Sequence, residues 1–289
     1  MTDGTLRVMT FNLLTSTKKR RSHPWRLRRR NVARLIRQAR PDVIGTQEAN
    51  RQQLLDLAAL LPEYEFIGEG NLGRRLADSE RSWYCAVFYR RDRVRPIDPD
   101  LPNEAYWLSP TPDVPASQYT LGSRPRLVTW TTFETVATGR TFVFGTTHLE
   151  ALNSWHRRRS ARQLREQVSR KVAALGADVP VFLTGDFNAV STSPEIQAMS
   201  VRDGDLEPLH DAWAFAGGDE TMGATFRGLG LRDRVGHRLL GSRRIDYVFF
   251  RGRLGVRDVR RLDFRGLDHR EAAVPSDHYP VLAEFELAV

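Results

Sequence analysis

The stretch Val179-Pro180-Val181-Phe182-Leu183-Thr184-Gly185-Asp186-Phe187-Asn188 joins a short apolar run to a polar tip. Its apolar residues favour a buried strand, and Gly185 permits a tight turn or a close approach to another group. Asp186 and Asn188 are two positions apart, so their side chains can point to the same side of the strand end. Such oxygen groups suit a magnesium-type ion or an attacking water, but an Asx-type turn explains them equally well.

The bulk composition is that of a soluble globular protein. The chain has 289 residues, of which 40% are hydrophobic and 27% are charged, enough for a substantial core. It has no run of about 18 apolar residues that would predict a membrane span, and the segment Met1-Thr2-Asp3-Gly4 shows no signal-peptide pattern. The single cysteine, Cys85, cannot form an internal disulfide and suits a reducing compartment. We therefore expect a cytoplasmic monomer.

The positive charge of the chain is unevenly distributed. The net charge is +9 and the pI is about 10.2. Between Thr5 and Pro41 there is no acidic residue, while basic residues accumulate: Lys18, Lys19, Arg20, Arg21, Arg26, Arg28, Arg29, Arg30, Arg34, Arg37 and Arg40. This block favours a polyanionic or phosphate-bearing partner, and a solvated helix face is the alternative.

Hydrophobic spacing predicts many strands and a few helices. We expect helices from 25 to the residue before Pro41, and at 52–61, 154–175, 194–199 and 209–215. We expect strands at 6–14, 42–46, 64–67, 84–89, 127–136, 141–149, from Val181, and at 245–250, 254–264 and 281–287. The proline-rich segment 95–125 and the glycine-rich segment 217–241 are predicted loops. Since no repeat or linker appears, we expect one domain over residues 1–289, with two packed sheets and helices outside them.

Polar residues fall repeatedly at the predicted strand ends. They are Asn12, Glu48, His148, Asp186, Asn188, Asp246, Asp277 and His278. Each has a structural explanation: His148 could be a satisfied structural histidine, Asp246 could bond Arg243 or Arg244, and Asp277 could cap a turn. Together they predict a functional site, because sites collect at the ends of elements in a rigid scaffold.

Six segments in order resemble the motifs of the endonuclease/exonuclease/phosphatase superfamily. They are Thr10-Phe11-Asn12-Leu13-Leu14, Ile44-Gly45-Thr46-Gln47-Glu48, Thr147-His148-Leu149, Gly185-Asp186-Phe187-Asn188, Arg244-Ile245-Asp246-Tyr247-Val248 and Ser276-Asp277-His278-Tyr279-Pro280-Val281. The resemblance implies a deoxyribonuclease I-like α+β fold, a four-layer αββα sandwich of two packed mixed β-sheets flanked by helices. It says little about substrate, because that fold serves many.

The resemblance also implies a metal centre that would hold Mg²⁺ or Mn²⁺, because its ligands offer oxygen atoms. Glu48 would be the principal ligand, with Asn12 beside it, and Asp277 matches a metal-site acid. Asp186 would orient or deprotonate the attacking water, or bind a second ion, and Asn188 would fix the phosphate or a metal.

The resemblance further implies that two histidines of this chain would contact the phosphate. His278 would contact the scissile phosphate, with Asp246 holding its ring in the right tautomer, and His148 would donate a hydrogen bond to a phosphate oxygen. The chain departs from the pattern at Trp83, where many members carry a glutamate, and its Glu80 lies slightly upstream.

The expected function is therefore metal-dependent phosphodiester hydrolysis by an activated water, with DNA or RNA as the favoured substrate because the basic block adjoins Asn12. The first alternative is a phosphatase or phosphodiesterase that acts on a small phosphorylated molecule or a lipid head group. The others are a non-catalytic binding protein on the same scaffold and hydrolysis of a non-phosphate bond. The segment Tyr106-Trp107-Leu108-Ser109-Pro110-Thr111-Pro112 is similar to uncharacterised bacterial members of the family.

Overall fold

The computed structural model describes residues 4–16, 23–98, 104–220, 223–228, 243–267 and 273–287. Its elements are β1 (Thr5–Asn12), α1 (Trp25–Ala39), β2 (Val43–Gln47), α2 (Arg51–Leu60), β3 (Tyr64–Gly70), η1 (Arg74–Leu76), β4 (Tyr84–Arg90), β5 (Val94–Pro96), β6 (Glu104–Trp107), β7 (Leu127–Thr135), β8 (Thr141–His148), α3 (Ser154–Leu175), β9 (Val181–Asp186), α4 (Pro194–Ser200), β10 (His210–Asp211), α5 (Ala212–Phe215), β11 (Asp246–Arg251), β12 (Leu254–Arg261) and β13 (Val281–Leu287).

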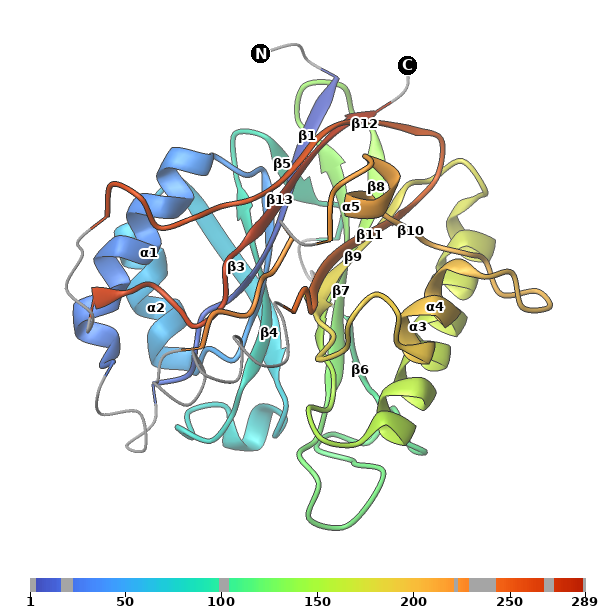
Figure 1. Ribbon diagram of the computed structural model, residues 1–289, viewed down its shortest axis with the longest axis horizontal. Helices are drawn as coiled ribbons and strands as arrows, with labels where there is room; N and C mark the ends of the chain where they lie inside the picture. Colours follow the sequence, from blue (N-terminus) through green and yellow to red (C-terminus); the bar gives the residue numbers. More distant parts are fainter. Residues whose placement is uncertain are drawn as a thin grey trace.

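The strands form two mixed sheets that pack face to face (Figure 1). The strand order is β12-β13-β1-β2-β4-β3 in the first sheet and β10-β11-β9-β8-β7-β5 in the second, where β6 also pairs with β7. Figure 1 shows α1 and α2 outside the first sheet and α3 and α4 outside the second. The predicted four-layer αββα architecture is confirmed.

Apolar side chains fill all three spaces between these layers, because neighbouring residues of a strand face opposite sides of a sheet. In β1, Met9 belongs to the cluster under α1 and α2, whereas Val8 belongs to the cluster between the sheets. The ring centroids of Phe182 and Phe285 lie 4.8 Å apart across that middle space. The third cluster packs Leu183 of β9 with Leu164 of α3.

Each sheet has a parallel strand pair at its centre. The chain passes from β1 through α1 to the parallel strand β2, and from β8 through α3 to the parallel strand β9. A parallel pair needs such a crossover connection. The two pairs contact each other, β1 against β9 and β2 against β8, and Gln47 donates through Nε2 to the Thr146 hydroxyl across the interface at 3.0 Å. The four carboxyl ends therefore meet at one end of the sandwich, opposite the chain termini in Figure 1.

Most predicted elements are observed, and two predictions need correction. The predicted loop 95–125 contains the end of β5, which pairs with β7, and β6, a short edge strand whose Glu104 pairs with Trp130 of β7. The predicted helix 209–215 begins only at Ala212, because residues 210–211 pair with β11 as β10. The Lys18 to Arg21 segment and parts of the 217–241 segment lie outside the described residues. No helix in the part of the chain that the structure describes is long and apolar enough to cross a membrane.

Candidate active site

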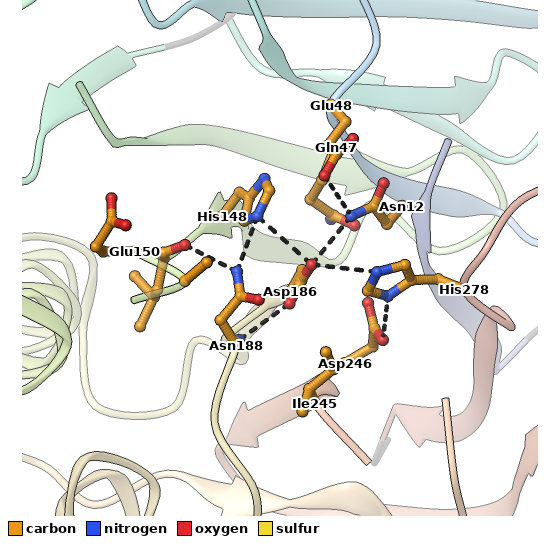
Figure 2. Close-up of polar contacts among 12 residues, drawn as sticks. Asn12, Gln47, Glu48, His148, Glu150, Asp186, Asn188, Ile245, Asp246 and His278 are labelled. Atoms are coloured by element: carbon orange, nitrogen blue, oxygen red, sulfur yellow. Dashed lines mark hydrogen bonds and ion pairs between the residues drawn. The ribbon is translucent and has the colours of Figure 1, made fainter. Parts of the chain in front are cut away.

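The four carboxyl ends of the parallel pairs each supply one polar residue to a common centre. Asn12 ends β1, Glu48 follows β2, His148 ends β8 and Asp186 ends β9. The antiparallel neighbours bring the rest, since Asp246 begins β11 and pairs with Asp186 across the sheet. Figure 2 shows Asn12, His148, Asn188 and His278 arranged around Asp186, each joined to it by a dashed contact.

The Asp186 carboxylate closes a turn and also lies at the centre of the polar contacts. Its Oδ1 accepts the Asn188 backbone N–H at 2.9 Å, which is an Asx turn. Its Oδ2 accepts Asn12 Nδ2–H at 3.0 Å and lies 3.5 Å from His148 Nε2 and 3.7 Å from His278 Nε2. Burial, with Asp246 adding to it and His278 opposing it, raises the pKa of Asp186 to about 7.

Glu48 faces Asp186 across Asn12. Asn12 Nδ2 donates to Glu48 Oε1 at 3.4 Å as well as to Asp186, and Glu48 Oε2 accepts the Thr15 backbone N–H at 3.1 Å. Glu48 has a φ of 68° and Asn188 a φ of 50°, in the left-handed region that residues other than glycine rarely adopt. Strained backbone of this kind clusters at functional sites.

The His278 ring is held by Asp246. Its Nδ1 lies 2.9 Å from Asp246 Oδ2, and the Asp246 backbone N–H donates to Thr225 Oγ1 at 3.1 Å. Burial alone would lower the pKa of His278, but the Asp246 and Asp186 carboxylates outweigh it and raise the pKa well above its ordinary value. Its Nε2 faces the Asp186 carboxylate at 3.7 Å, and the raised pKa favours a proton on the ring.

Neither arginine next to Asp246 in sequence holds that carboxylate. Arg244 pairs instead with Asp211 and Glu220 through its Nη2 atom, at 2.6 Å and 2.5 Å, and no ion pair joins Arg243 to Asp246 among the residues that the structure covers. The structural explanation of Asp246 from its arginine neighbours is wrong.

His148 is a neutral ring beside Asn188. The Asn188 amide donates to His148 Nε2 and to the Leu149 carbonyl, both at 3.0 Å, so the ring proton belongs on Nδ1. Burial lowers the pKa of His148 well below its ordinary value, and the positive charges of Arg126, His278 and Arg124 act in the same direction. Donation of a hydrogen bond to a phosphate oxygen would then come from Nδ1.

Two residues that the sequence did not single out as site residues hold its loops together. Arg28 is fully buried and donates to the carbonyls of Leu13, Leu14 and Pro275 at 2.9, 2.7 and 2.5 Å. The Ser276 hydroxyl donates to the Asn12 carbonyl at 2.6 Å. For Arg28, the expectation of a polyanion contact is wrong, because this buried guanidinium joins the loop after β1 to the segment before β13.

The residues present fit a hard divalent cation. Glu48 and Asp186 direct carboxylate oxygens at the same amide, and one oxygen of the buried Asp246, Oδ1, has no hydrogen-bond partner. Ligand atoms of Asp186, Asp246 and His278 lie within 4.8 Å of one another. Carboxylates and amides are what Mg²⁺ and Mn²⁺ prefer. The Asp277 carboxylate accepts a 3.4 Å hydrogen bond from the Ser276 hydroxyl.

The chain matches one family over nearly its whole length. The model of the Endonuclease/Exonuclease/phosphatase family matches residues 9–278. No curated protein matches the chain.

Among solved structures, an endonuclease/exonuclease/phosphatase from Bacteroides vulgatus is 26% identical, with 98% of this chain and 99% of that chain covered and a TM-score of 0.78. The mannosyl-6-phosphatase Bt3783 of Bacteroides thetaiotaomicron is 27% identical, with 97% and 99% covered and a TM-score of 0.78. D. rerio TDP2 complexed with a single-strand DNA product, at 18% identity, 97% and 98% coverage and a TM-score of 0.67, shares the fold. This chain belongs to the endonuclease/exonuclease/phosphatase family.

Proposed function

We propose that this protein is a divalent-metal-dependent phosphoesterase that uses water to break a phosphate ester. The observation that carries the proposal is the buried Asp186 oxygen, which is met at once by Asn12, His148 and His278. Two histidines and an amide around one buried carboxylate are groups that can bind phosphate and transfer protons.

Glu48, Asn12 and Asp186 would hold the ion, which we propose to be Mg²⁺ or Mn²⁺. A bound divalent cation supplies positive charge against the charge that develops on the phosphate. The role of Asp277 as a metal acid stays a prediction; its charge acts on the adjacent His278, where it helps to raise the pKa.

The remaining residues would position the phosphate, the attacking water and the His148 ring. His278 would donate its Nε2–H to a phosphate oxygen, because Asp246 occupies Nδ1 and fixes the ring. Asp186 would orient the attacking water and accept its proton. Asn188 would steady His148 from one side, as it does here through Nδ2.

We favour a small phosphorylated molecule as the substrate. The similar Bt3783 protein is a mannosyl-6-phosphatase, and the basic block that favoured nucleic acid is partly internal, because Arg28 is buried and Arg29 pairs with Asp56 at 3.1 Å. Nucleic acid is the second candidate, since the net charge is +9 and Arg26, Arg30 and Arg34 are exposed on α1. A cytoplasmic location and a monomeric state stay predictions.

A substrate panel with Mn²⁺ or Mg²⁺ tests the proposal. It holds sugar phosphates, p-nitrophenyl phosphate, bis-p-nitrophenyl phosphate, single- and double-stranded DNA, RNA, phosphoinositides and sphingomyelin. We expect metal-dependent turnover of at least one phosphate ester, lost in His278→Ala with no change in thermal unfolding beyond a few degrees. Binding of Mn²⁺ without turnover of any ester would favour the non-catalytic binding protein. Turnover of nucleic acid alone, falling steeply with salt, would favour the second candidate.

A further inference from the structure

We propose that Trp83 and Arg124 form a substrate-recognition subsite in which the guanidinium binds the terminal oxygens of a phosphate monoester. The inference rests on the proposed function, and it names the residues that would select a monoester over a diester.

Three planar groups line one wall of the candidate active site. The Arg124 guanidinium carbon lies 3.6 Å from the centroid of the Trp83 ring. The Trp83 ring is parallel to the His148 ring, with an interplanar angle of 5° and centroids 6.0 Å apart. His148 Nε2 lies 3.5 Å from Asp186 Oδ2. The row of His148, Trp83 and Arg124 therefore runs from the centre of the candidate site outward, with the Arg124 guanidinium at its far end.

Asn71 holds the two segments of this wall, those of Trp83 and Arg124, against each other. Its backbone N–H donates to the Trp83 carbonyl at 2.9 Å, and its Oδ1 accepts the Trp83 backbone N–H at 2.8 Å. Its Nδ2 donates to the carbonyl of Pro125, the residue after Arg124, at 3.0 Å. One buried amide thus ties the indole to the segment that carries the guanidinium, so that neither has to be ordered by a ligand.

The Arg124 guanidinium keeps hydrogen-bond donors available. Within the described residues, Nη1 donates to the Arg81 carbonyl at 3.2 Å, and no other hydrogen bond of this group occurs there. Its neighbour Arg126 is instead paired with Glu150 at 3.4 Å. Arg124 is half-buried, and its planar fork matches the oxygens of a phosphate better than an ammonium does.

The wall also reaches the proposed metal ligand. A cavity of about 10 Å³ is lined by Glu48, Trp83, Arg126 and His148, among others, which is the space of about one water. Arg124 does not line this cavity, which is too small for a phosphate, so the phosphate would lie outside it, between an ion at Glu48 and the row of His148, Trp83 and Arg124. A phosphate monoester carries nearly two negative charges at pH 7, whereas a diester carries one. A cation at this place favours the monoester.

The first measurement is calorimetric binding of inorganic phosphate in Mn²⁺ to the wild type and to Arg124→Gln. We expect the Kd to rise at least tenfold in Arg124→Gln and by less in Arg124→Lys, which keeps the charge without the fork. The matched control is Arg159→Gln, because Arg159 also lies over a tryptophan, 4.4 Å from the Trp155 centroid, and that ring contacts Tyr119 and His156 rather than His148. It should leave the Kd within twofold. An unchanged Kd in Arg124→Gln would overturn the proposal.

The second measurement compares kcat/KM for p-nitrophenyl phosphate and bis-p-nitrophenyl phosphate. Arg124→Gln should lower the monoester-to-diester ratio at least tenfold, mainly through KM of the monoester. Equal losses on both esters would mean that Arg124 only positions Trp83 and His148, which refutes the proposal. If the wild type turns over no ester of the whole panel, the proposed function is in error, and the phosphate titration still decides this subsite. Arg124→Lys replaces Arg124→Gln if the latter does not fold.

Discussion

Replacement of Gly185 by alanine should damage catalysis more than stability. A Cβ at this position would lie 2.4 Å from the Thr147 carbonyl oxygen and 3.0 Å from Thr147 Cγ2. Ordinary contacts begin at 3.4 Å, so β8 and β9 must separate by about 1 Å, typical of overpacking that costs about 1–3 kcal/mol. The adjacent residues in this register are His148 and Asp186. A shift of about 1 Å between catalytic groups costs about 100-fold in rate.

Urea unfolding and steady-state hydrolysis of the best ester in the panel would measure both effects. Gly4→Ala is the control, because its Cβ would meet nothing closer than the Leu287 carbonyl at 3.8 Å. We expect it to change neither the free energy of unfolding by more than about 0.5 kcal/mol nor kcat. A Gly185→Ala protein with wild-type kcat and wild-type stability would refute the close approach of the two strands and the dependence of the site on it.

Three further changes probe the site and its supports. Arg28→Met removes the donors of three loop carbonyls and should lower the free energy of unfolding by about 3 kcal/mol or more. The control is the exposed Arg30→Met. A loss under about 1 kcal/mol in urea for Arg28→Met, like that expected for the control, would contradict the role of Arg28 in holding the loops together. Asp246→Asn leaves the charged His278 ring without its carboxylate partner, so kcat should fall about 10²- to 10⁴-fold with little change in thermal unfolding; wild-type kcat would count against this pairing. Removal of divalent ions with a chelator should abolish hydrolysis, and Mn²⁺ should restore it and raise the unfolding temperature; full activity in chelator would rule out the metal role.

Local signals explain why much of the fold was predictable. The helix at 154–175 was predicted with its observed bounds, because Asn153 caps its start and Gly176 follows its last residue. The final strand, 281–287, was also predicted as observed, from its apolar run after Pro280. By contrast, β6 carries a weak pattern, because an edge strand of four residues depends on pairing with β7 rather than on its own sequence.

The members of the candidate site were predictable, but only some of their contacts were. The Asx turn that the sequence allowed at Asp186 is present, and the same carboxylate also accepts a hydrogen bond from the Asn12 amide. The resemblance implied that Asp246 holds the ring of His278, 32 residues away, and this contact is observed, whereas the arginine partners that the local sequence allowed for Asp246 are not. A count of charges cannot tell the buried Arg28 from a surface cation, since burial is decided by segments distant in sequence.

Hydrolysis of phosphate esters by Asp186→Asn, measured with saturating Mn²⁺ beside the wild type, tests the central claim most directly. The substitution keeps the shape of the side chain but removes the charge that would orient the water and accept its proton. The account predicts a fall in kcat of about 10²- to 10⁴-fold in a protein that still unfolds cooperatively. Turnover by Asp186→Asn within a few-fold of the wild type would contradict it.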